Sequence, residues 1–394
     1  MTFLRPGALA PIALAAAFAF APAFAHAQMS PGAGMGPTMP EYSTDSKNSS
    51  GRDLDNLQDK IKGYNGDDAD LYKPRSGGFD ALSPADQVAG MGAGVNLFEG
   101  DDPYFVSKSS RFSDNDIQRI ADAGFKTIRV PLFVFAHLSD DQGNPDPYYL
   151  KRIDHLVDLA TKAHLNIILD EHNYEECATD PDDCSTKLTN VWTALATHYQ
   201  NAPGNVMFEL LNEPNGKLDA ATWNAWLPGL VAAVRQTNPD RNIVIGPTMW
   251  NSPDQLATLQ LPADDHVIVT FHYYSPMEFT HQGASWVPAF TNTSGVRWTG
   301  TADEVAAIDA TFDKVKAWST ANNKPVFLGE FGSYAKVNPN IDDRAAWTRA
   351  VSKAAADRGF ARALWVYEGS AGFGIHDKDG NTWVEPLKAA LLLQ

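Results

Sequence analysis

The chain has 394 residues, 44% of them hydrophobic and 20% charged, which suits one large domain or two small ones. Its formal net charge is −17, and the resulting long-range field argues against nucleic acid and anionic membrane surfaces as partners. A neutral or cationic ligand fits better, although an acidic surface can also serve solubility alone.

The N-terminal residues predict export. Arg5 precedes an apolar run over 8–25, and Ala25-His26-Ala27 is an A-x-A cleavage pattern, so we expect residues 1–27 to be a secretory signal peptide. A membrane anchor is the alternative, but no later stretch approaches the about 18–20 apolar residues that a membrane-spanning helix needs. We therefore expect a secreted or periplasmic protein without a membrane partner. We also expect it to be a monomer, although the signal peptide does not bear on the oligomeric state.

Residues 28–82 differ in composition from the rest of the chain. The stretch MSPGAGMGPTMPEYSTDSKNSSGRD, 29–53, is rich in Pro, Gly, Ser and Met and lacks an apolar period, which is typical of a disordered tail or linker. LDNLQDKIKGY, 54–64, predicts at most a short helix. We expect a single folded domain over residues 83–394.

Eight short apolar runs lie in this domain, and they are continuous rather than alternating, as in parallel strands covered on both faces. Because helical patterns separate them, the runs predict an α/β protein with a (β/α)₈ TIM barrel. An open doubly wound sheet is the competing fold, but the first run lacks the G-x-G-x-x-G turn of its dinucleotide-binding form. The runs are GAGVNLF (92–98), KTIRVP (126–131), NIILD (166–170), NVMFEL (205–210), NIVIGP (242–247), HVIVTFHYY (266–274), PVFLGE (325–330) and ALWVY (363–367).

The helical segments carry their own start signals. Asp146-Pro147 precedes a helix expected over 149–163. Ser113 stands three residues before Asp116, and Thr301 three before Glu304, and both pairs resemble capping boxes. Further helices are expected over 187–199, 219–236, 341–357 and 384–392.

Polar and aromatic side chains gather at the ends of the apolar runs, where the catalytic groups of a barrel lie. Taken singly, Arg129 could be a structural ion-pair partner, and His272 and Trp365 could be core residues. Random surface polarity would not concentrate in this way, so together these side chains predict a functional site. They are Arg129 in the second run, His172 and Asn173 after the third, Asn212 and Glu213 after the fourth, His272 and Tyr274 in the sixth, Glu330 in the seventh and Trp365 in the eighth.

Glu213 and Glu330 suggest the chemistry. One protonated and one ionised carboxylate cleave a glycosidic bond, because one donates a proton to the departing oxygen while the other attacks or stabilises the anomeric centre. Pro214 should hold Glu213 in extended backbone geometry, and Arg129 would keep one carboxylate ionised. The chain has no G-x-S-x-G elbow and no H-E-x-x-H helix, and we expect no metal and no cofactor.

Two motifs give the chain a resemblance to glycoside hydrolase family 5, the endoglucanase or cellulase type. LLNEP (210–214) looks like the acid/base motif of that family and LGEFG (328–332) like its nucleophile motif. HYYSPMEFTHQGASW (272–286) and HNYEE (172–176) are similar to a bacterial branch of the family. The resemblance covers about residues 84–394, and the two motifs together are far more specific than N-E-P alone.

The resemblance implies Glu213 as general acid/base and Glu330 as nucleophile. The other residues would bind the sugar or tune this pair: Asn212 at the sugar 2-hydroxyl, Arg129 near the nucleophile, His172 on the glycone side, Asn173 where many relatives carry a second histidine, His272 beside the acid/base, Tyr274 on the nucleophile, and Trp365 as the sugar platform.

The predicted function is a retaining endo-β-glycosidase that hydrolyses β-1,4-glucan, either soluble cellulose derivatives or mixed-linkage glucan, through a covalent glycosyl-enzyme. Mannan and xyloglucan stay open as substrates of the same scaffold. A non-catalytic polysaccharide-binding barrel is another class, but it has no need of a matched acid and nucleophile. A barrel isomerase or aldolase would need a Schiff-base lysine or a phosphate site at a strand end.

The remaining side chains of note are two cysteines, one acid and three tryptophans. Cys177 and Cys184 predict a disulfide that closes a small loop, with two free thiols as the alternative. Glu209, inside the fourth run, is expected to be a paired group of the barrel interior. The tryptophans, candidates for further sugar subsites or for packing, are Trp250, Trp286 and Trp298.

Overall fold

The computed structural model describes residues 78–98, 113–336, 340–368, 372–377 and 381–394. The signal peptide predicted over 1–27, the possible helix over 54–64 and the predicted tail up to residue 77 lie outside the described residues. Among the described helices, none combines the length and the apolar character that a membrane span needs.

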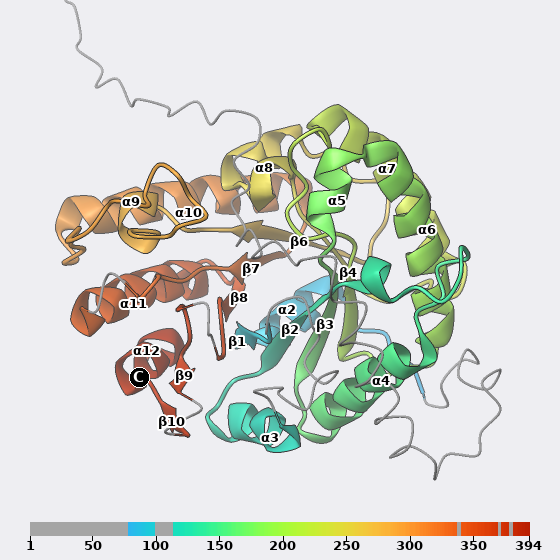
Figure 1. The fold of residues 1–394 in the computed structure, drawn as a ribbon, viewed down its shortest axis with the longest axis horizontal. Coiled ribbons are helices and arrows are strands. Elements are labelled where there is room, and N and C mark those ends of the chain that lie inside the picture. The colour runs from blue at the N-terminus through green and yellow to red at the C-terminus, as the bar shows by residue number, and fades with distance from the viewer. Residues whose placement is uncertain (1–77, 99–112, 337–339, 369–371, 378–380) are drawn as a thin grey trace, which may run out of the picture. The chain divides into compact units, whose positions relative to one another are not determined.

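Eight parallel strands form a closed barrel in which each strand pairs with its neighbours in chain order and β8 pairs with β1 (Figure 1). This confirms the predicted (β/α)₈ fold, and each strand overlaps its predicted apolar run. The strands are β1 (Ala93–Asn96), β2 (Thr127–Leu132), β3 (Asn166–Glu171), β4 (Val206–Glu209), β5 (Ile243–Ile245), β6 (Val267–His272), β7 (Val326–Glu330) and β8 (Ala361–Leu364).

Both faces of the barrel sheet are buried, which explains the continuous apolar runs. In β3, Ile167 and Leu169 pack outward against the helices, whereas Ile168 lies in the barrel interior with Met207 of β4. Since successive side chains of a strand point to opposite faces, Asp170 and Glu209 also face the interior, one layer above Ile168 and Met207. The barrel interior therefore has an apolar layer of side chains and, towards the carboxyl ends of the strands, a charged layer.

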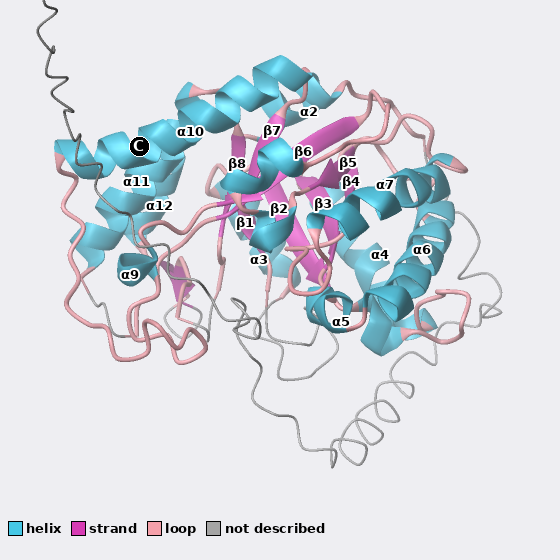
Figure 2. Cartoon of the chain, turned by 90° about the horizontal axis from the view of Figure 1, so that it is seen from above, coloured by secondary structure: helices cyan, strands magenta, loops and turns pink. Residues whose placement is uncertain are grey.

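Helices surround the strands, as Figure 2 shows. The longer ones are α3 (Asp114–Asp122), α4 (Pro147–Lys162), α6 (Pro181–His198), α7 (Ala220–Arg235), α10 (Ala302–Asn322), α11 (Ile341–Asp357) and α12 (Glu385–Leu392). Shorter elements are α5 (Tyr174–Thr179), α8 (Thr248–Asn251), α9 (Met277–Thr280), the 3₁₀ helices η3 (Val134–His137) and η4 (Pro253–Thr258), and the strands β9 (His376–Asp377) and β10 (Thr382–Trp383). The fifth unit departs from the regular pattern, because the short α8 and η4 replace a long helix after β5.

The predicted helix starts carry the expected caps. Both capping boxes are present, at Ser113 for α3 and at Thr301 for α10. The side chain of Asp146 accepts hydrogen bonds from the first turn of α4. Helix α6 begins at Pro181, six residues earlier than expected, because Asp180 caps it.

The folded region begins before residue 83. Helix α2 (Pro84–Met91) inserts Val88 and Met91 among the interior side chains at the amino-terminal end of the barrel. Upstream of it, the carbonyl oxygen of Leu82 accepts a hydrogen bond from Asn242, and the Arg241 guanidinium lies 4.6 Å from the ring centre of Phe79. Residues 79–82 thus contact the barrel, although their composition predicts a tail.

Candidate active site

A buried arginine, Arg129, lies at the centre of the charged layer. The expectation that Arg129 lies at the end of its strand is wrong, because β2 continues to Leu132 and Arg129 is its third residue. Its neighbours Ile128 and Val130 pack outward, so the Arg129 side chain points into the barrel. The length of an arginine side chain explains how a mid-strand residue reaches the strand ends.

All three nitrogens of the Arg129 guanidinium are used, and they join five strands or strand ends. Because the group is planar and always charged, it fixes both the position and the ionisation of the carboxylates around it. Its contacts are Nε to Glu209 Oε2 at 2.7 Å, Nη2 to Glu209 Oε1 at 2.9 Å, Nη2 to Asn212 Oδ1 at 2.8 Å, Nη2 to Asp170 Oδ2 at 3.0 Å, Nη1 to Asn96 Oδ1 at 3.0 Å and Nη1 to Glu330 Oε1 at 2.8 Å.

Glu213 and Glu330 meet above Arg129. One carboxylate oxygen of each and a ring nitrogen of His272 all lie within 4.8 Å of one another. His272 Nδ1 is 2.7 Å from Glu213 Oε1 and 3.6 Å from Glu330 Oε2, and the Tyr274 hydroxyl donates to Glu330 Oε2 at 2.9 Å. This separation fits the about 5–5.5 Å between the carboxyl groups of retaining glycosidases rather than the wider gap of inverting ones.

The surroundings favour a proton on Glu213 and a charge on Glu330. Burial raises the pKa of Glu213 well above its usual range, and the nearby Glu330 carboxylate adds to the shift. Burial also raises the pKa of Glu330, but Arg129 opposes that shift and the Tyr274 hydroxyl stabilises the anion. Since two carboxylates this close do not readily ionise together, the proton stays on the one without a guanidinium contact, Glu213.

His172 and Asn212 form a second buried hydrogen-bonded chain. His172 Nδ1 lies 2.6 Å from Asp170 Oδ2, and the Asn212 amide nitrogen lies 3.2 Å from His172 Nε2. Burial lowers the pKa of His172 to about 3, so the ring is neutral and donates from Nδ1 to Asp170. The Asn212 amide is thereby oriented with its oxygen on Arg129 and its nitrogen towards His172.

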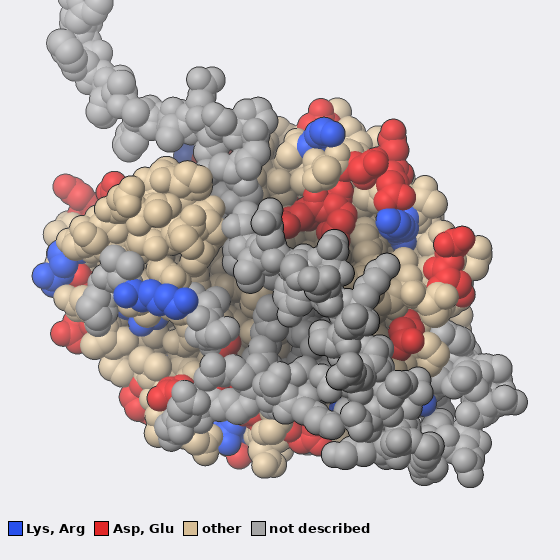
Figure 3. Space-filling model, in the orientation of Figure 1, with Lys and Arg blue, Asp and Glu red and all other residues tan. Residues whose placement is uncertain are grey.

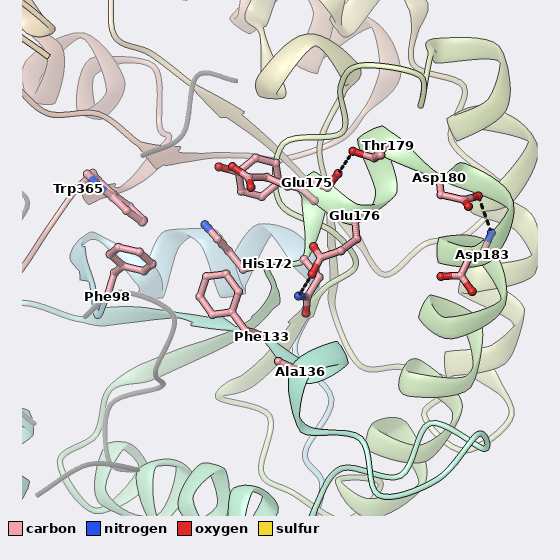
Figure 4. Close-up of a pocket in the computed structure, with 12 residues that line it drawn as sticks. Phe98, Phe133, Ala136, His172, Glu175, Glu176, Thr179, Asp180, Asp183 and Trp365 are labelled. Atoms are coloured by element: carbon pink, nitrogen blue, oxygen red, sulfur yellow. Dashed lines mark hydrogen bonds between the residues drawn. The ribbon is translucent and has the colours of Figure 1, made fainter. Parts of the chain in front are cut away.

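A cavity of about 660 Å³ opens beside His172 and Trp365 (Figure 4). Its aromatic end is formed by Trp365 and Phe98, whose ring centres lie 4.9 Å apart, with Phe133 and His172 next to them. Asn173 also lines the cavity, but its amide bonds to Glu176 and to the Phe135 backbone. His172 links the aromatic end to the catalytic region, because it contacts Asn212, the residue before Glu213, and the aromatic rings offer an apolar face to a sugar ring.

The other end of the cavity is acidic. Figure 4 shows Glu175, Glu176, Asp180 and Asp183 on α5 and the start of α6, and Figure 3 shows acidic side chains gathered over α5. The structure joins Cys177 of α5 to Cys184 of α6 in a disulfide, as the sequence predicts. We refer to these four carboxylates as the acidic wall.

One expectation from the sequence is wrong at this site. Glu213 has a φ of 41°, in the left-handed region, rather than the extended geometry expected before proline. The Asn215 side chain donates to the Glu213 carbonyl oxygen at 2.8 Å and helps to hold this backbone. For the three tryptophans, which the sequence leaves open between subsites and packing, Trp298 is buried in the core and therefore a packing residue, whereas Trp250 and Trp286 are half-buried.

Glu213, His272 and Glu330 have enough donor atoms to contact a cation. The Arg129 guanidinium, 2.8 Å from Glu330, already supplies a fixed positive charge there. The expectation that no metal or organic cofactor is needed stays a prediction.

Comparison with known proteins decides the family. Residues 88–370 match the family model described as Cellulase (glycosyl hydrolase family 5). The chain belongs to glycosyl hydrolase family 5. The predicted family is thus confirmed, and the barrel is a glycoside hydrolase barrel of the endoglucanase type.

Individual relatives of this family 5 chain are endoglucanases. Endoglucanase H of Acetivibrio thermocellus is 30% identical over 309 residues, which are 78% of this chain but only 32% of that protein, so the chain spans about a third of its length. A solved hyperthermophilic endo-β-1,4-glucanase in complex with substrate is 34% identical, with a TM-score of 0.74 over 79% of this chain and 100% of that chain. The endoglucanase of Thermotoga maritima, solved with mannotriose, is 30% identical, with a TM-score of 0.73 over 78% of this chain and 99% of that chain.

All the residues predicted for the family 5 site lie around this centre: seven contact one another, and Asn173 and Trp365 line the adjoining cavity. Sequence reasoning gave no role to Asp170, Phe98 or Phe133. Asp170 is the last residue of the third apolar run, so its position was a usable signal. Phe98 and Phe133 resemble ordinary core residues in the sequence, and only the fold brings them to the cavity.

Proposed function

We propose that the protein is a secreted, retaining endo-β-1,4-glucanase. The observation that carries this proposal is the pair Glu213 and Glu330, with oxygens within 4.8 Å and only Glu330 bonded to Arg129. A site built in this way holds one proton and one charge on two facing carboxyl groups. Such a pair is the requirement for double displacement at an anomeric carbon.

Each carboxyl group has a role in both halves of the reaction. The ionised Glu330 carboxylate attacks the anomeric carbon, the bond to the departing oxygen breaks, and Glu213 transfers its proton to that oxygen. A covalent glycosyl ester of Glu330 results. Water then gives a proton to Glu213 and attacks the same carbon, Glu330 departs as carboxylate, and the product keeps its β configuration.

The other predicted residues support this reaction. Arg129 and Tyr274 stabilise the ionised Glu330 carboxylate, both before it attacks and when it departs, through contacts of 2.8 and 2.9 Å. Asn212, oriented by Arg129 and His172, presents its remaining N–H to the sugar 2-hydroxyl. Trp365 supplies the apolar face on which the sugar ring stacks.

The substrate proposal is a soluble or mixed-linkage β-1,4-glucan. Support comes from relatives described as endoglucanases and from the solved endo-β-1,4-glucanase complex. Mannan is the second candidate because a relative was solved with mannotriose, and xyloglucan stays open. Secretion is proposed from the sequence features of residues 1–27 alone.

The deciding experiment is the stereochemistry of azide rescue. Glu330→Gly should lose activity on β-glucan by roughly 10⁴-fold or more, because no nucleophile replaces the carboxylate. With azide and an activated aryl β-cellobioside, this variant should form an α-glycosyl azide, since azide enters from the vacated face. Glu213→Gly is the matched control and should form the β-glycosyl azide. A β product from Glu330→Gly would show that the two roles are exchanged, and substantial turnover without azide would refute the nucleophile assignment.

A further inference from the structure

A buried asparagine outside the predicted site reaches the acid/base through a histidine. The Asn251 amide nitrogen lies 3.2 Å from His272 Nε2, and His272 Nδ1 lies 2.7 Å from Glu213 Oε1. All three side chains are buried, and Asn251 has no exposed surface. A chain of two hydrogen bonds therefore connects Asn251 to Glu213.

The chain fixes the position of a proton. An amide NH₂ group only donates, so His272 Nε2 must accept from Asn251. Burial lowers the pKa of His272 well below its usual range, and the neutral ring carries one N–H. That hydrogen must then sit on Nδ1, where it points at Glu213 Oε1.

The backbone at Asn251 is held in an unusual conformation. Met249, Trp250 and Asn251 are consecutive, and their φ angles are 54°, 59° and 53°, all in the left-handed region. A side chain strains the backbone in this region, which is therefore mostly limited to glycine, asparagine and aspartate. The Trp250 backbone N–H donates to the carbonyl oxygen of Pro214 at 3.3 Å, which ties this turn to the segment that carries Glu213.

The Asn251 amide packs closely against Gly246. A Cβ built at Gly246 would overlap the amide oxygen and lie 2.9 Å from the amide nitrogen, so only glycine leaves room for this side chain. The oxygen has no hydrogen-bond partner among the described residues. Asn251 thus keeps a buried, unpaired oxygen while its nitrogen contacts His272, an arrangement that stability alone does not favour.

We propose that Asn251 is a positioning residue that fixes the tautomer of His272 and thereby keeps the proton of Glu213 on the oxygen that faces the substrate. This inference rests on the proposed function, in which Glu213 is the general acid. With Nδ1–H bonded to Oε1, the acidic proton of Glu213 must reside on Oε2. If Nδ1 lost its hydrogen, it would accept the proton of Glu213, and the acid would point at the imidazole instead of the glycosidic oxygen.

No additional reactant is needed for this role. During bond cleavage the proton moves from Glu213 Oε2 to the departing oxygen, and Nδ1–H stays in place and stabilises the new carboxylate. The charged and titratable groups around Glu213 and His272 come from β2, β3, β4 and β7, from the segments after β3 and β6, and from α5: Arg129, Asp170, His172, Tyr174, Glu209, Tyr274 and Glu330.

The first test reads the tautomer itself. Nitrogen-15 NMR of histidine-labelled wild type should show His272 protonated on Nδ1 and unprotonated on Nε2. Asn251→Asp places an acceptor at Nε2 and should move the hydrogen there. A wild-type spectrum with the hydrogen on Nε2, or an unchanged spectrum in Asn251→Asp, would overturn the inference.

The second test uses a series of aryl β-cellobiosides whose phenols range from strongly to weakly acidic. Weakly acidic phenols need protonation to leave, so Asn251→Asp should lose about 10- to 100-fold more kcat/KM on them than on strongly acidic ones, a part of the 10²–10⁴ that general acid catalysis contributes. Asn251→Gly adds no charge, tolerates the positive φ, and should show a smaller loss in the same direction. Asn251→Gly can also be used for the same measurement if Asn251→Asp does not fold.

Asn323 provides matched controls, because it has a φ of 49° at the end of α10 and lies exposed before β7, at the other end of the barrel. Asn323→Asp and Asn323→Gly should leave kcat/KM unchanged for every aryl cellobioside of the series.

An equal loss of kcat/KM on all phenols in the Asn251 variants would show a purely structural role for Asn251 and refute the inference. If wild type hydrolysed none of the cellobiosides, the proposed function would fail and the inference with it. If wild type is active and kcat/KM depends on phenol acidity equally in wild type and in the Asn251 variants, the inference alone is refuted.

Discussion

Glu213 shows how a single residue can depend on backbone strain for its function. Its φ of 41° lies in a region that costs a non-glycine residue about 1–2 kcal/mol. The Asn215 side chain donates to the Glu213 carbonyl oxygen in this conformation, and the Glu213 carboxylate contacts His272. Strain of this kind persists when the surrounding contacts fix it, and it places the acid/base without relying on a flexible side chain.

Arg129 offers the clearest prediction for a single residue. Arg129→Lys keeps one positive charge but loses the planar fork that contacts Glu209, Asn212 and Glu330 together. Arg129 lowers the pKa of Glu330, so a weaker contact should raise that pKa. The ionised nucleophile would then appear only at higher pH, and the acid limb of the kcat/KM profile should move towards neutral pH.

The same substitution should also reduce stability. Removing one partner of a buried ion pair costs about 3–5 kcal/mol, and lysine should lose about 1–3 kcal/mol of it in the free energy of unfolding. Arg235→Lys is the control, because Arg235 pairs with Asp264 away from the site. It should lower stability without moving the pH profile, and an unmoved acid limb in Arg129→Lys would contradict the role assigned to Arg129.

At the scale of the elements, the sequence predicts most of what local chemistry determines. Continuous apolar runs located the strands, and the caps at Ser113 and Thr301 located helix starts. Asn251 could not be found in this way, because its proposed role depends on a left-handed turn and on a contact with His272 of β6. The sequence also places Arg129 at the end of its strand, whereas it lies in the middle. Its long side chain allows it to contact the carboxylates near the strand ends from there.

The short helix α5 and the start of α6 determine the charge of the cavity. The acidic wall faces the same space as Trp365, and the Cys177–Cys184 disulfide joins the two helices that carry it. The acidic wall should repel the negative charges of a polysaccharide such as carboxymethyl cellulose. We therefore expect a neutral mixed-linkage glucan to be hydrolysed faster than carboxymethyl cellulose of similar length.

Neutralising part of the wall should reduce this preference. Glu175→Gln with Asp183→Asn should raise the ratio of kcat/KM for carboxymethyl cellulose over neutral glucan by about two- to fivefold at low salt, and 1 M salt should remove most of the gain because it shortens the screening length to about 3 Å. Asp182→Asn is the matched control, since Asp182 lies on the same helix but does not line the cavity. A ratio that responds to neither the substitutions nor salt would mean that the wall does not contact the polymer.

At the scale of the whole molecule, the two ends of the barrel have separate tasks. The carboxyl-terminal end holds the charged layer and the cavity, whereas helix α2 closes the amino-terminal end with Val88 and Met91. Gln87 links this helix to the barrel through Asn166 at 2.7 Å and Asn242 at 3.2 Å. Changes at the amino-terminal end should therefore affect stability and leave the chemistry intact.

A stepwise N-terminal truncation tests this division. Removal of residues 28–77, which are predicted to be tail, should leave the unfolding temperature and the kcat on soluble glucan unchanged. Extending the deletion to Leu82 removes the contact of Phe79 with Arg241, worth about 0.5–2 kcal/mol, and should lower the unfolding temperature slightly. Extending it to Met91 exposes the barrel interior and removes two buried side chains that contribute about 1.5–3 kcal/mol each, a large share of the about 5–15 kcal/mol that stabilises a typical domain. Thermal unfolding followed by circular dichroism measures the unfolding temperature of each truncated protein. A clear drop already on removal of residues 28–77 would show that this region packs on the barrel.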